Sequence, residues 1–337
     1  MAVRTLDNIG IKAAPDFERL RNVLLRKKQS GRIPFYELYV NQGVMENLLG
    51  KKIQNRAETV EFYYKAGYDY VPAWPGVPLK RGSLVDSSTG YPVKGRKSFE
   101  EYAWPRQEEV DLSEFETVVP VLPDGMKIIG QTGGIFECLE YLCGYEGLCC
   151  MLYDERDLVV EILDRIEEVY VWMYEGMAQF DEVGAIVISD DMGFKTQTLI
   201  APDDLRELIL PRHKRLAQIA HKYGKPCILH SCGNLKDIMD EIISSVGIDA
   251  KHSYEDAIMP VNEAKQIYGS RIAILGGFDV DRLCRESEEN IRKHTEFLLA
   301  DCGRDGGYAL GSGNSIADYV PIENYLTMLE AGWHFNK

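Results

Sequence analysis

A histidine and a cysteine stand two residues apart at the end of the apolar run KPCILHSCGN, residues 225–234. In an extended strand, residues i and i+2 point to the same side, so His230 and Cys232 can aim at one ion. Histidine nitrogen and cysteine thiolate are both good zinc ligands. The alternative is a buried strand with a core histidine and a thiol that happens to lie nearby. We hypothesise that the pair is part of a metal site, which needs further ligands from elsewhere in the chain.

Further polar residues follow the other apolar runs, and they are rich in metal ligands and acid–base groups. They are Trp74, Gln131, Thr132, Asp190, Asp191, His252, Tyr254, Glu255, Asp279, Ser312 and Asn314. An ordinary set of loop residues is mixed and mostly Gly, Ser, Lys and Glu. The acids also have structural alternatives. Asp190 and Asp191 can cap a helix or end a strand in a solvated turn, and Asp279 can cap the helix that follows it.

The elements that carry these residues alternate between short apolar runs and amphipathic helices. Candidate strands are expected at residues 33–40, 68–74, 126–132, 185–193, 226–233, 250–256, 272–279 and 308–316. The helical patterns between them have residues that commonly start and end helices, such as Pro202 near a helix start and Gly224 at its end. This alternation predicts a parallel sheet, and continuous apolar runs are typical of strands that are buried on both faces.

Eight strand–helix units in 337 residues predict a closed (β/α)8 TIM barrel rather than an open doubly wound sheet. We expect a single domain over residues 1–337, with an N-terminal extension and a flap or small hairpin inserted at about 79–113. Neither a Gly-x-Gly-x-x-Gly after the first strand nor a P-loop motif is present. In such barrels the active site lies at the C-terminal ends of the strands, where the polar residues collect.

The composition is that of an acidic globular protein, with 45% hydrophobic and 27% charged residues. A formal net charge of -15 argues against nucleic acid as a partner. No stretch approaches the roughly 18 consecutive apolar residues of a transmembrane helix, and the N-terminus lacks the apolar core of a signal peptide. We therefore expect a cytoplasmic protein without a membrane partner. The eight cysteines lack the spacing of a disulfide framework, and most are expected to be buried, reduced thiols.

Four segments together resemble the uroporphyrinogen decarboxylase superfamily. They are SDDMGFKTQTLIAPDDLRELILPRHKRL, LHSCGNLKDIMDEII, AILGGFDVDRL and GSGNSIADYVPIENYLTML. Within the superfamily they look most like the branch that includes corrinoid-dependent methyltransferases. The resemblance covers most of the chain and is strongest from about 126 to 330. Families of this type are (β/α)8 barrels, which agrees with the independent count of units.

The resemblance implies a zinc site. Zinc methyltransferases of the superfamily carry His-x-Cys, then an acidic residue, then a later cysteine in a Gly-Cys-Gly-like turn. Here His230 and Cys232 match the pair, and Glu255 fits the acidic ligand. Ser312, in GSG, stands in place of the last cysteine. Water, a substrate atom or another side chain would then complete the tetrahedron.

The resemblance predicts a zinc-dependent methyltransferase that moves a methyl group between a small molecule and a corrinoid (cobalamin). The corrinoid is expected on a separate protein, because this chain has no Asp-x-His-x-x-Gly motif. Asp190, Asp191 and Asn314 are expected to be catalytic. The expected substrate-binding residues are Trp74, Gln131, Tyr254, Asp279 and Ser312.

Two other functions stay open at this point. The first is a decarboxylase-like lyase that uses Asp190 or Asp191 without a metal. The decarboxylase holds its tetrapyrrole carboxylates with an arginine-rich loop after the first strand. The matching segment here, YELYVNQGVMENLLG, has Glu37 and no arginine. The second is a non-catalytic, small-molecule-binding barrel that has lost its chemistry.

Overall fold

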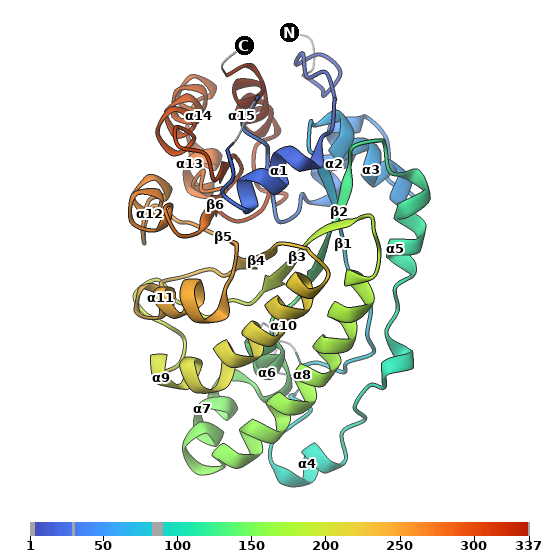
Figure 1. The fold of residues 1–337 in the computed structure, drawn as a ribbon, viewed down its shortest axis with the longest axis vertical. Helices are drawn as coiled ribbons and strands as arrows, with labels where there is room; N and C mark the ends of the chain where they lie inside the picture. The colour runs from blue at the N-terminus through green and yellow to red at the C-terminus, as the bar shows by residue number, and fades with distance from the viewer. Residues whose placement is uncertain (1–3, 29–30, 83–89, 336–337) are drawn as a thin grey trace.

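The structure, a computed structural model, describes residues 4–28, 31–82 and 90–335. A parallel sheet of seven strands runs in sequence order from β1 to β7, with helices packed around it (Figure 1). The strands are β1 Tyr70–Ala73, β2 Lys127–Thr132, β3 Val183–Ser189, β4 Cys227–His230, β5 Ala250–His252, β6 Ala273–Leu275 and β7 Tyr308–Ala309. Each forms at one of the predicted apolar runs, so the predicted α/β class and parallel order are confirmed.

The first predicted strand, 33–40, is held at the far edge of the sheet by isolated bridges. Phe35 pairs in parallel with Leu310, and Val40 with Ile316, just beyond β7. Among the residues that the structure describes, no backbone bridge joins this segment to β1. The sheet is therefore seven strands with an eighth segment on one edge, and a fully closed eight-stranded barrel is not seen.

Side chains span the remaining gap between this segment and the first strands. The Tyr70 hydroxyl accepts a hydrogen bond from the backbone N–H of Glu37 at 2.8 Å, and the Gln131 side-chain amide donates to the carbonyl of Leu38 at 2.7 Å. Both bonds are buried. They satisfy backbone groups that a strand ladder would otherwise pair.

Fifteen α-helices connect the strands within the described residues. They are α1 Phe17–Leu24, α2 Gln42–Leu49, α3 Arg56–Lys65, α4 Arg96–Glu100, α5 Ser113–Val118, α6 Ile135–Cys143, α7 Tyr145–Asp154, α8 Arg156–Ala178, α9 Pro202–Asp204, α10 Leu210–Lys222, α11 Met239–Glu241, α12 Val261–Tyr268, α13 Val280–Arg285, α14 Glu288–Cys302 and α15 Ile322–His334. None of the helices in the described part of the chain is long and apolar enough to cross a membrane.

The amphipathic pattern of each helix decides which face it buries. In α8, residues at helical spacing are buried from Leu158 to Met177, including Ile162, Ile166 and Tyr170. This stripe packs the helix against α10 and α6. The strands are buried on both faces, as in β4, where all four residues are buried. The core therefore lies between the sheet and the surrounding helices.

The predicted insertion at 79–113 carries short helices in its described part. It contains α4 and a 3-10 turn at Gln107–Glu109, and residues 83–89 lie outside the described residues. An isolated antiparallel bridge between Gly76 and Asp111 joins its two ends. No hairpin ladder occurs in the described part of this insertion.

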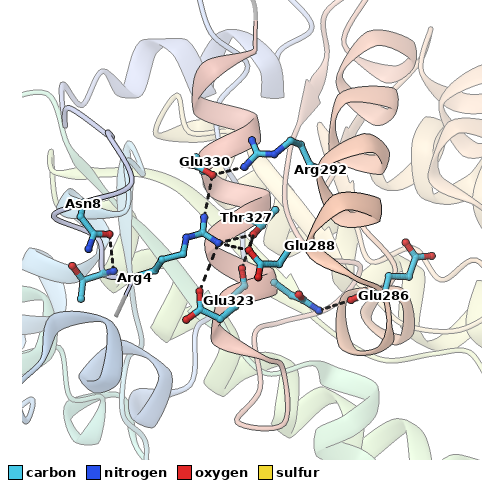
Figure 2. A network of polar contacts seen from close by, with 10 residues as sticks. Arg4, Asn8, Glu286, Glu288, Arg292, Glu323, Thr327 and Glu330 are labelled. Atoms are coloured by element: carbon cyan, nitrogen blue, oxygen red, sulfur yellow. Dashed lines mark hydrogen bonds and ion pairs between the residues drawn. The ribbon is translucent and has the colours of Figure 1, made fainter. Parts of the chain in front are cut away.

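The N-terminal extension is fastened to the last two helices by ion pairs (Figure 2). The guanidinium of Arg4 lies 2.7 Å from Glu288, 3.0 Å from Glu330 and 3.6 Å from Glu323. It also donates to the hydroxyl of Thr327 at 2.9 Å. One cation thus neutralises carboxylates from α14 and α15, which would otherwise repel one another. The N-terminal extension and α15 consequently lie at the same end of the molecule (Figure 1).

We expect Arg4→Gln to lower the free energy of unfolding by about 1 kcal/mol, because it leaves the acidic cluster without its shared cation. Urea unfolding at low salt measures the change. Lys97→Gln is the matched control, since Lys97 pairs only loosely with Glu101, at 3.9 Å on the surface. Equal effects of the two substitutions would show that the Arg4 cluster does not fasten the extension.

Candidate metal centre

Three residues at the ends of two adjacent strands form a candidate metal centre. Asp191, His230 and Cys232 offer ligand atoms that all lie within 4.8 Å of one another. His230 Nε2 is 3.6 Å from Cys232 Sγ and 3.7 Å from Asp191 Oδ1. The cluster forms because β3 and β4 pair in parallel with Ser189 opposite His230, which brings the two strand ends together.

Gly193 and Gly233 allow the loop after β3 to meet the loop after β4. Gly233 has φ of 80°, and a Cβ atom there would lie 2.1 Å from the carbonyl carbon of Gly193. Only glycine fits this close approach at a positive φ. The backbone N–H of Cys232 then donates to Asp191 Oδ1 at 2.8 Å. The loops therefore hold the thiol beside the carboxylate.

A chain of hydrogen bonds fixes which nitrogen of His230 is free. His252 Nε2 lies 3.1 Å from the carbonyl oxygen of Ser312, and a carbonyl only accepts, so Nε2 carries the proton. His252 Nδ1 is then an acceptor, and His230 Nδ1, at 2.8 Å, must donate to it. The lone pair of His230 is left on Nε2, which faces Cys232 and Asp191. A metal-binding histidine is usually held in this way, with its other ring N–H donating to a neighbouring acceptor.

The electrostatics keep both imidazoles neutral and the thiol protonated when no cation is present. Burial, and then the charge of Lys251, lowers the pKa of His230 to about 3. Burial also holds the pKa of His252 well below its usual range. The pKa of Cys232 is raised to about 12, first by burial and then by the neighbouring Asp191. A metal ion would reverse this last effect, because coordination deprotonates a thiol.

The sulfur of Cys232 is surrounded by donors. The Asn314 amide lies 3.1 Å from Sγ, and the hydroxyl of Ser253 lies 3.7 Å from it. Behind them, the buried ammonium of Lys251 donates to the carbonyls of Ser231 and Ser253, at 3.2 and 2.7 Å. These groups favour a thiolate once a metal binds. Asn314 therefore contacts the centre, and its catalytic role stays a prediction.

Asp190, next to the candidate metal centre, holds neighbouring parts of the fold together. Its carboxylate accepts from the N–H groups of Phe136 and Glu137, both at 2.9 Å, and so caps the start of α6. His213 Nε2 is a third partner at 2.7 Å. Gly134 permits the approach, since a Cβ atom there would lie 1.9 Å from the carboxylate. The contacts of Asp190 are thus all internal, whereas the side chain of Asp191 is 39% exposed.

Ser312 is turned away from the candidate ligands. Its hydroxyl donates to Glu37 Oε2 at 2.5 Å and its backbone N–H bonds Glu37 Oε1 at 2.7 Å. Ser312 is fully buried. The serine therefore supports His252 through its carbonyl, and it does not offer its hydroxyl where the related enzymes place a cysteine.

Glu255 lies outside the cluster, contrary to the expectation that it is the acidic ligand. Its ligand atoms are not among those within 4.8 Å of one another. It lines a separate small hollow together with Lys251 and Tyr254. The carboxylate in the cluster is that of Asp191, because the end of β3 adjoins His230 on one side of β4.

The remaining predicted substrate residues have mixed surroundings. Asp279 caps α13 by accepting from two N–H groups of its first turn, and Gln131 bonds the Leu38 carbonyl. Tyr254 has a buried hydroxyl without a hydrogen-bond partner in the described residues, and the Lys251 ammonium lies 4.5 Å from its ring centre. Trp74 is half-buried beyond β1. Their substrate roles stay predictions.

Sequence reasoning did not assign roles to the residues that support the ligands. Lys251, His252 and Ser253 all do so, and they follow directly on one another at the end of β5. The signal was present, because a Lys-His-Ser run at the end of a buried strand places three polar groups where apolar ones are expected. Their partners could be identified only once the fold placed β5 beside β4.

The chain belongs to the uroporphyrinogen decarboxylase (URO-D) family, which it matches over residues 96–333. It is 25% identical over 221 residues to a uroporphyrinogen decarboxylase of Anaeromyxobacter dehalogenans, and 29% identical over 137 residues to a methylated-thiol--coenzyme M methyltransferase of Methanosarcina mazei. These matches cover 63% and 40% of this chain. The family expected from the sequence is confirmed, and both relatives are enzymes.

The matched regions span 61% of the decarboxylase and 34% of the methyltransferase. A solved methyltransferase structure from Methanosarcina mazei superposes with a TM-score of 0.71 at 19% identity, covering 93% of this chain and 97% of that one. The superposition confirms that the two chains share a fold.

The carboxyl group of Glu37 is buried beneath the site, and its burial makes the free energy of unfolding depend on pH. Burial raises the pKa of this carboxyl to about 8, although its bonds to Ser312 oppose the change. An unfolded chain ionises Glu37 near pH ~4.3, so its contribution to stability is fully present below that pH and is lost as pH rises to about 8. Glu37→Gln should remove this part of the pH dependence.

As the pH rises from 5 to 8, the parent should lose stability relative to Glu37→Gln. We expect the free energy of unfolding of the variant to gain on that of the parent by roughly 1 kcal/mol per pH unit. Urea unfolding at several pH values measures it. Glu137 and Glu140, whose pKa values burial also raises to about 8, leave the variant with a residual slope. Parallel curves for parent and variant would mean that Glu37 is ionised in the folded protein.

Proposed function

We propose that the protein is a zinc-dependent methyltransferase that moves a methyl group between a small molecule and a corrinoid carried on a separate protein. The observation that supports it is the convergence of the His230 Nε2 lone pair with Cys232 Sγ and Asp191 Oδ1. A relative whose name gives a methylated thiol as its substrate supports the same chemistry. The proposed partners are a small-molecule methyl donor or acceptor and the corrinoid protein, and neither nucleic acid nor membrane is a proposed partner.

The donor set fits zinc. One imidazole nitrogen, one thiol sulfur and one carboxylate oxygen are the ligand types of zinc sites, and three protein ligands leave a fourth position open for water or substrate. Ser312 does not fill that position, because its hydroxyl is bonded to Glu37. Zinc bound there would hold a substrate thiol as thiolate near neutral pH and so activate its sulfur.

The protein residues then orient the centre. His252 holds the ring of His230, the Asn314 amide donates to the cysteine sulfur, and the Cys232 thiol donates to the Ser253 hydroxyl. Asp191 is anchored by the N–H of Cys232, so the acid and the thiol keep a fixed spacing. In the transfer, a sulfur lone pair forms the new S–CH3 bond. The bond between the methyl carbon and its donor breaks, and its electron pair leaves with the donor.

A metal-free decarboxylase is less well supported. Asp190, one of its two candidate acids, is fully buried and bonded to α6 and His213. The acid of the first segment, Glu37, is also buried and bonded to Ser312. A substrate with many carboxylates needs cations, and residues 36–50 contain no arginine. A non-catalytic barrel has no observation in its favour. The cytoplasmic location remains a prediction from the sequence.

We expect about one zinc per chain in protein purified without a chelator. Cys232→Ser and Asp191→Asn should each weaken zinc binding at least tenfold, because each removes one of only three protein ligands. Glu255→Gln and Cys284→Ser are the controls and should leave zinc affinity unchanged. Competition with a chromophoric chelator gives the affinities. Loss of zinc in Glu255→Gln, but not in Asp191→Asn, would restore the ligand set that was predicted from the sequence alone.

The proposed activity is tested by methyl transfer from free methylcobalamin to small thiols, followed by the change in corrinoid absorbance. We expect transfer by zinc-loaded protein and its loss in Cys232→Ser. Transfer that is equal in metal-free protein would contradict the proposal. Decarboxylation of a porphyrinogen by metal-free protein would establish the lyase instead.

A further inference from the structure

A second hollow opens beside the candidate metal centre, and its lining is both aromatic and acidic. It has a volume of about 450 Å³ and lies between Tyr91, the helices α6 and α7, and the loop that follows β3. The side chains of Tyr91, Tyr145 and Phe194 supply three aromatic rings, and Glu140 supplies a carboxylate. The volume is within the usual range of small-molecule sites.

Glu140 is the unusual member of this lining. The residue is only 6% exposed. Within the described part of the chain, none of the hydrogen bonds or ion pairs involves its carboxylate. Burial, followed by the nearby charges of Asp190 and Asp191, raises its pKa to about 8. Buried carboxyl groups normally have a partner, so an acid without one that faces a hollow indicates a site for a positively charged ligand.

The aromatic rings indicate what kind of cation fits. Phe194 is 63% exposed and Tyr145 is 43% exposed, although such side chains are usually covered. The hydroxyl of Tyr145 donates to the carbonyl of Leu199 at 2.5 Å, which fixes the ring at the rim of the hollow. Aromatic rings grouped around an acid recognise methyl-substituted ammonium groups, because the ring faces attract the diffuse charge.

The hollow adjoins the loop that carries the candidate ligand Cys232. The carbonyl of Phe194 accepts the N–H of Asn234 at 2.8 Å, and the Asn234 amide donates to the carbonyl of Thr196. Asn234 is two residues from Cys232. Phe194 is likewise three residues from Asp191, so the loops after β3 and β4 each carry a candidate ligand and also contact each other beside the hollow.

The nearest described cation does not neutralise the hollow. The guanidinium of Arg81 lies 5.8 Å from the ring centre of Tyr141. Among the described residues it forms no ion pair with Glu137 or Glu140. Burial and the neighbouring acids raise the pKa of both Glu137 and Glu140 to about 8, so a cation bound here would favour their ionisation, whereas an anion would oppose it.

We propose that this hollow binds the ammonium group, amine or quaternary, of a substrate whose thiol or thioether sulfur meets the metal centre. The assignment of the sulfur rests on the proposed function. The substrate is then a cationic aminothiol or its S-methyl derivative. An anionic thiol such as a sulfonate gains nothing from these acids and is not the proposed substrate.

The site is tested first without any metal, by calorimetric titration of the full chain with choline and with its neutral isostere 3,3-dimethylbutan-1-ol. We expect choline to bind at least tenfold more tightly, since only the cation gains from Glu140 and the rings. Glu140→Gln should abolish this preference, and Phe194→Ala should weaken choline about fivefold. Glu146→Gln, an exposed neighbour of Tyr145, is the matched control and should change nothing. Equal binding of the two isosteres would overturn the proposal.

A thiol series separates this inference from the proposed function. Cobalt-substituted protein is titrated with thiocholine, cysteamine, 2-mercaptoethanol and 2-mercaptoethanesulfonate, and thiolate-to-metal absorption is followed. We expect affinity to fall in that order, and the advantage of thiocholine over mercaptoethanol to be lost in Glu140→Gln. If mercaptoethanol binds the metal as well as thiocholine does, the cation site is wrong and the proposed function stands. If no thiol reaches the metal while choline still binds, the proposed function fails and the cation site stands.

Discussion

The candidate centre depends on one hydrogen-bonded chain that runs through the interior of the protein. Glu37 binds the N–H and hydroxyl of Ser312, the Ser312 carbonyl accepts from His252, and His252 accepts from His230. Each link has a fixed direction because the Ser312 carbonyl can only accept. The result is a single tautomer of His230 with its lone pair toward Cys232 and Asp191. If this direction were reversed, a proton would point at the position of the metal.

The same chain explains why the interior of the sheet is polar. Its members come from the segment before β1, from β4 and β5, and from the turn after β7, so they are far apart in sequence. The hydrogen-bonded chain also reinforces two segments that isolated backbone bridges hold together. The segment 33–40 bridges the residues after β7, and Glu37 on this segment binds Ser312 on that turn. A buried network of this kind is favourable only when its members are satisfied, which ties the geometry of the site to the integrity of the fold.

Much of this arrangement could be predicted from the sequence. The apolar runs located all seven strands, and the His-x-Cys spacing located two of the three candidate ligands. Glu255, the acidic ligand that the resemblance implies, lies outside the cluster, because the resemblance gives the order of residues along the chain but not which neighbouring loop turns inward. Asp191 and Glu255 both follow strands that flank β4, and side-chain geometry alone separates them.

Other features depend on contacts that no sequence pattern records. Asp190 and Asp191 are adjacent and chemically identical, yet the close approach of Gly134 commits Asp190 to α6 and leaves Asp191 at the centre. The resemblance implies a ligand position at Ser312, but the Ser312 hydroxyl is bonded to Glu37. Both outcomes result from partners more than 50 residues away. Local propensity and spacing cannot predict such pairings.

X-ray absorption at the zinc edge of the loaded protein tests the central claim most directly, because it counts the donor atoms. The account predicts one sulfur at about 2.3 Å, one imidazole nitrogen and otherwise oxygen donors, with the sulfur contribution absent in Cys232→Ser. It also predicts an unchanged spectrum in Glu255→Gln. A zinc shell without sulfur, or one that changes in Glu255→Gln but not in Asp191→Asn, would contradict the assignment of the centre to Asp191, His230 and Cys232.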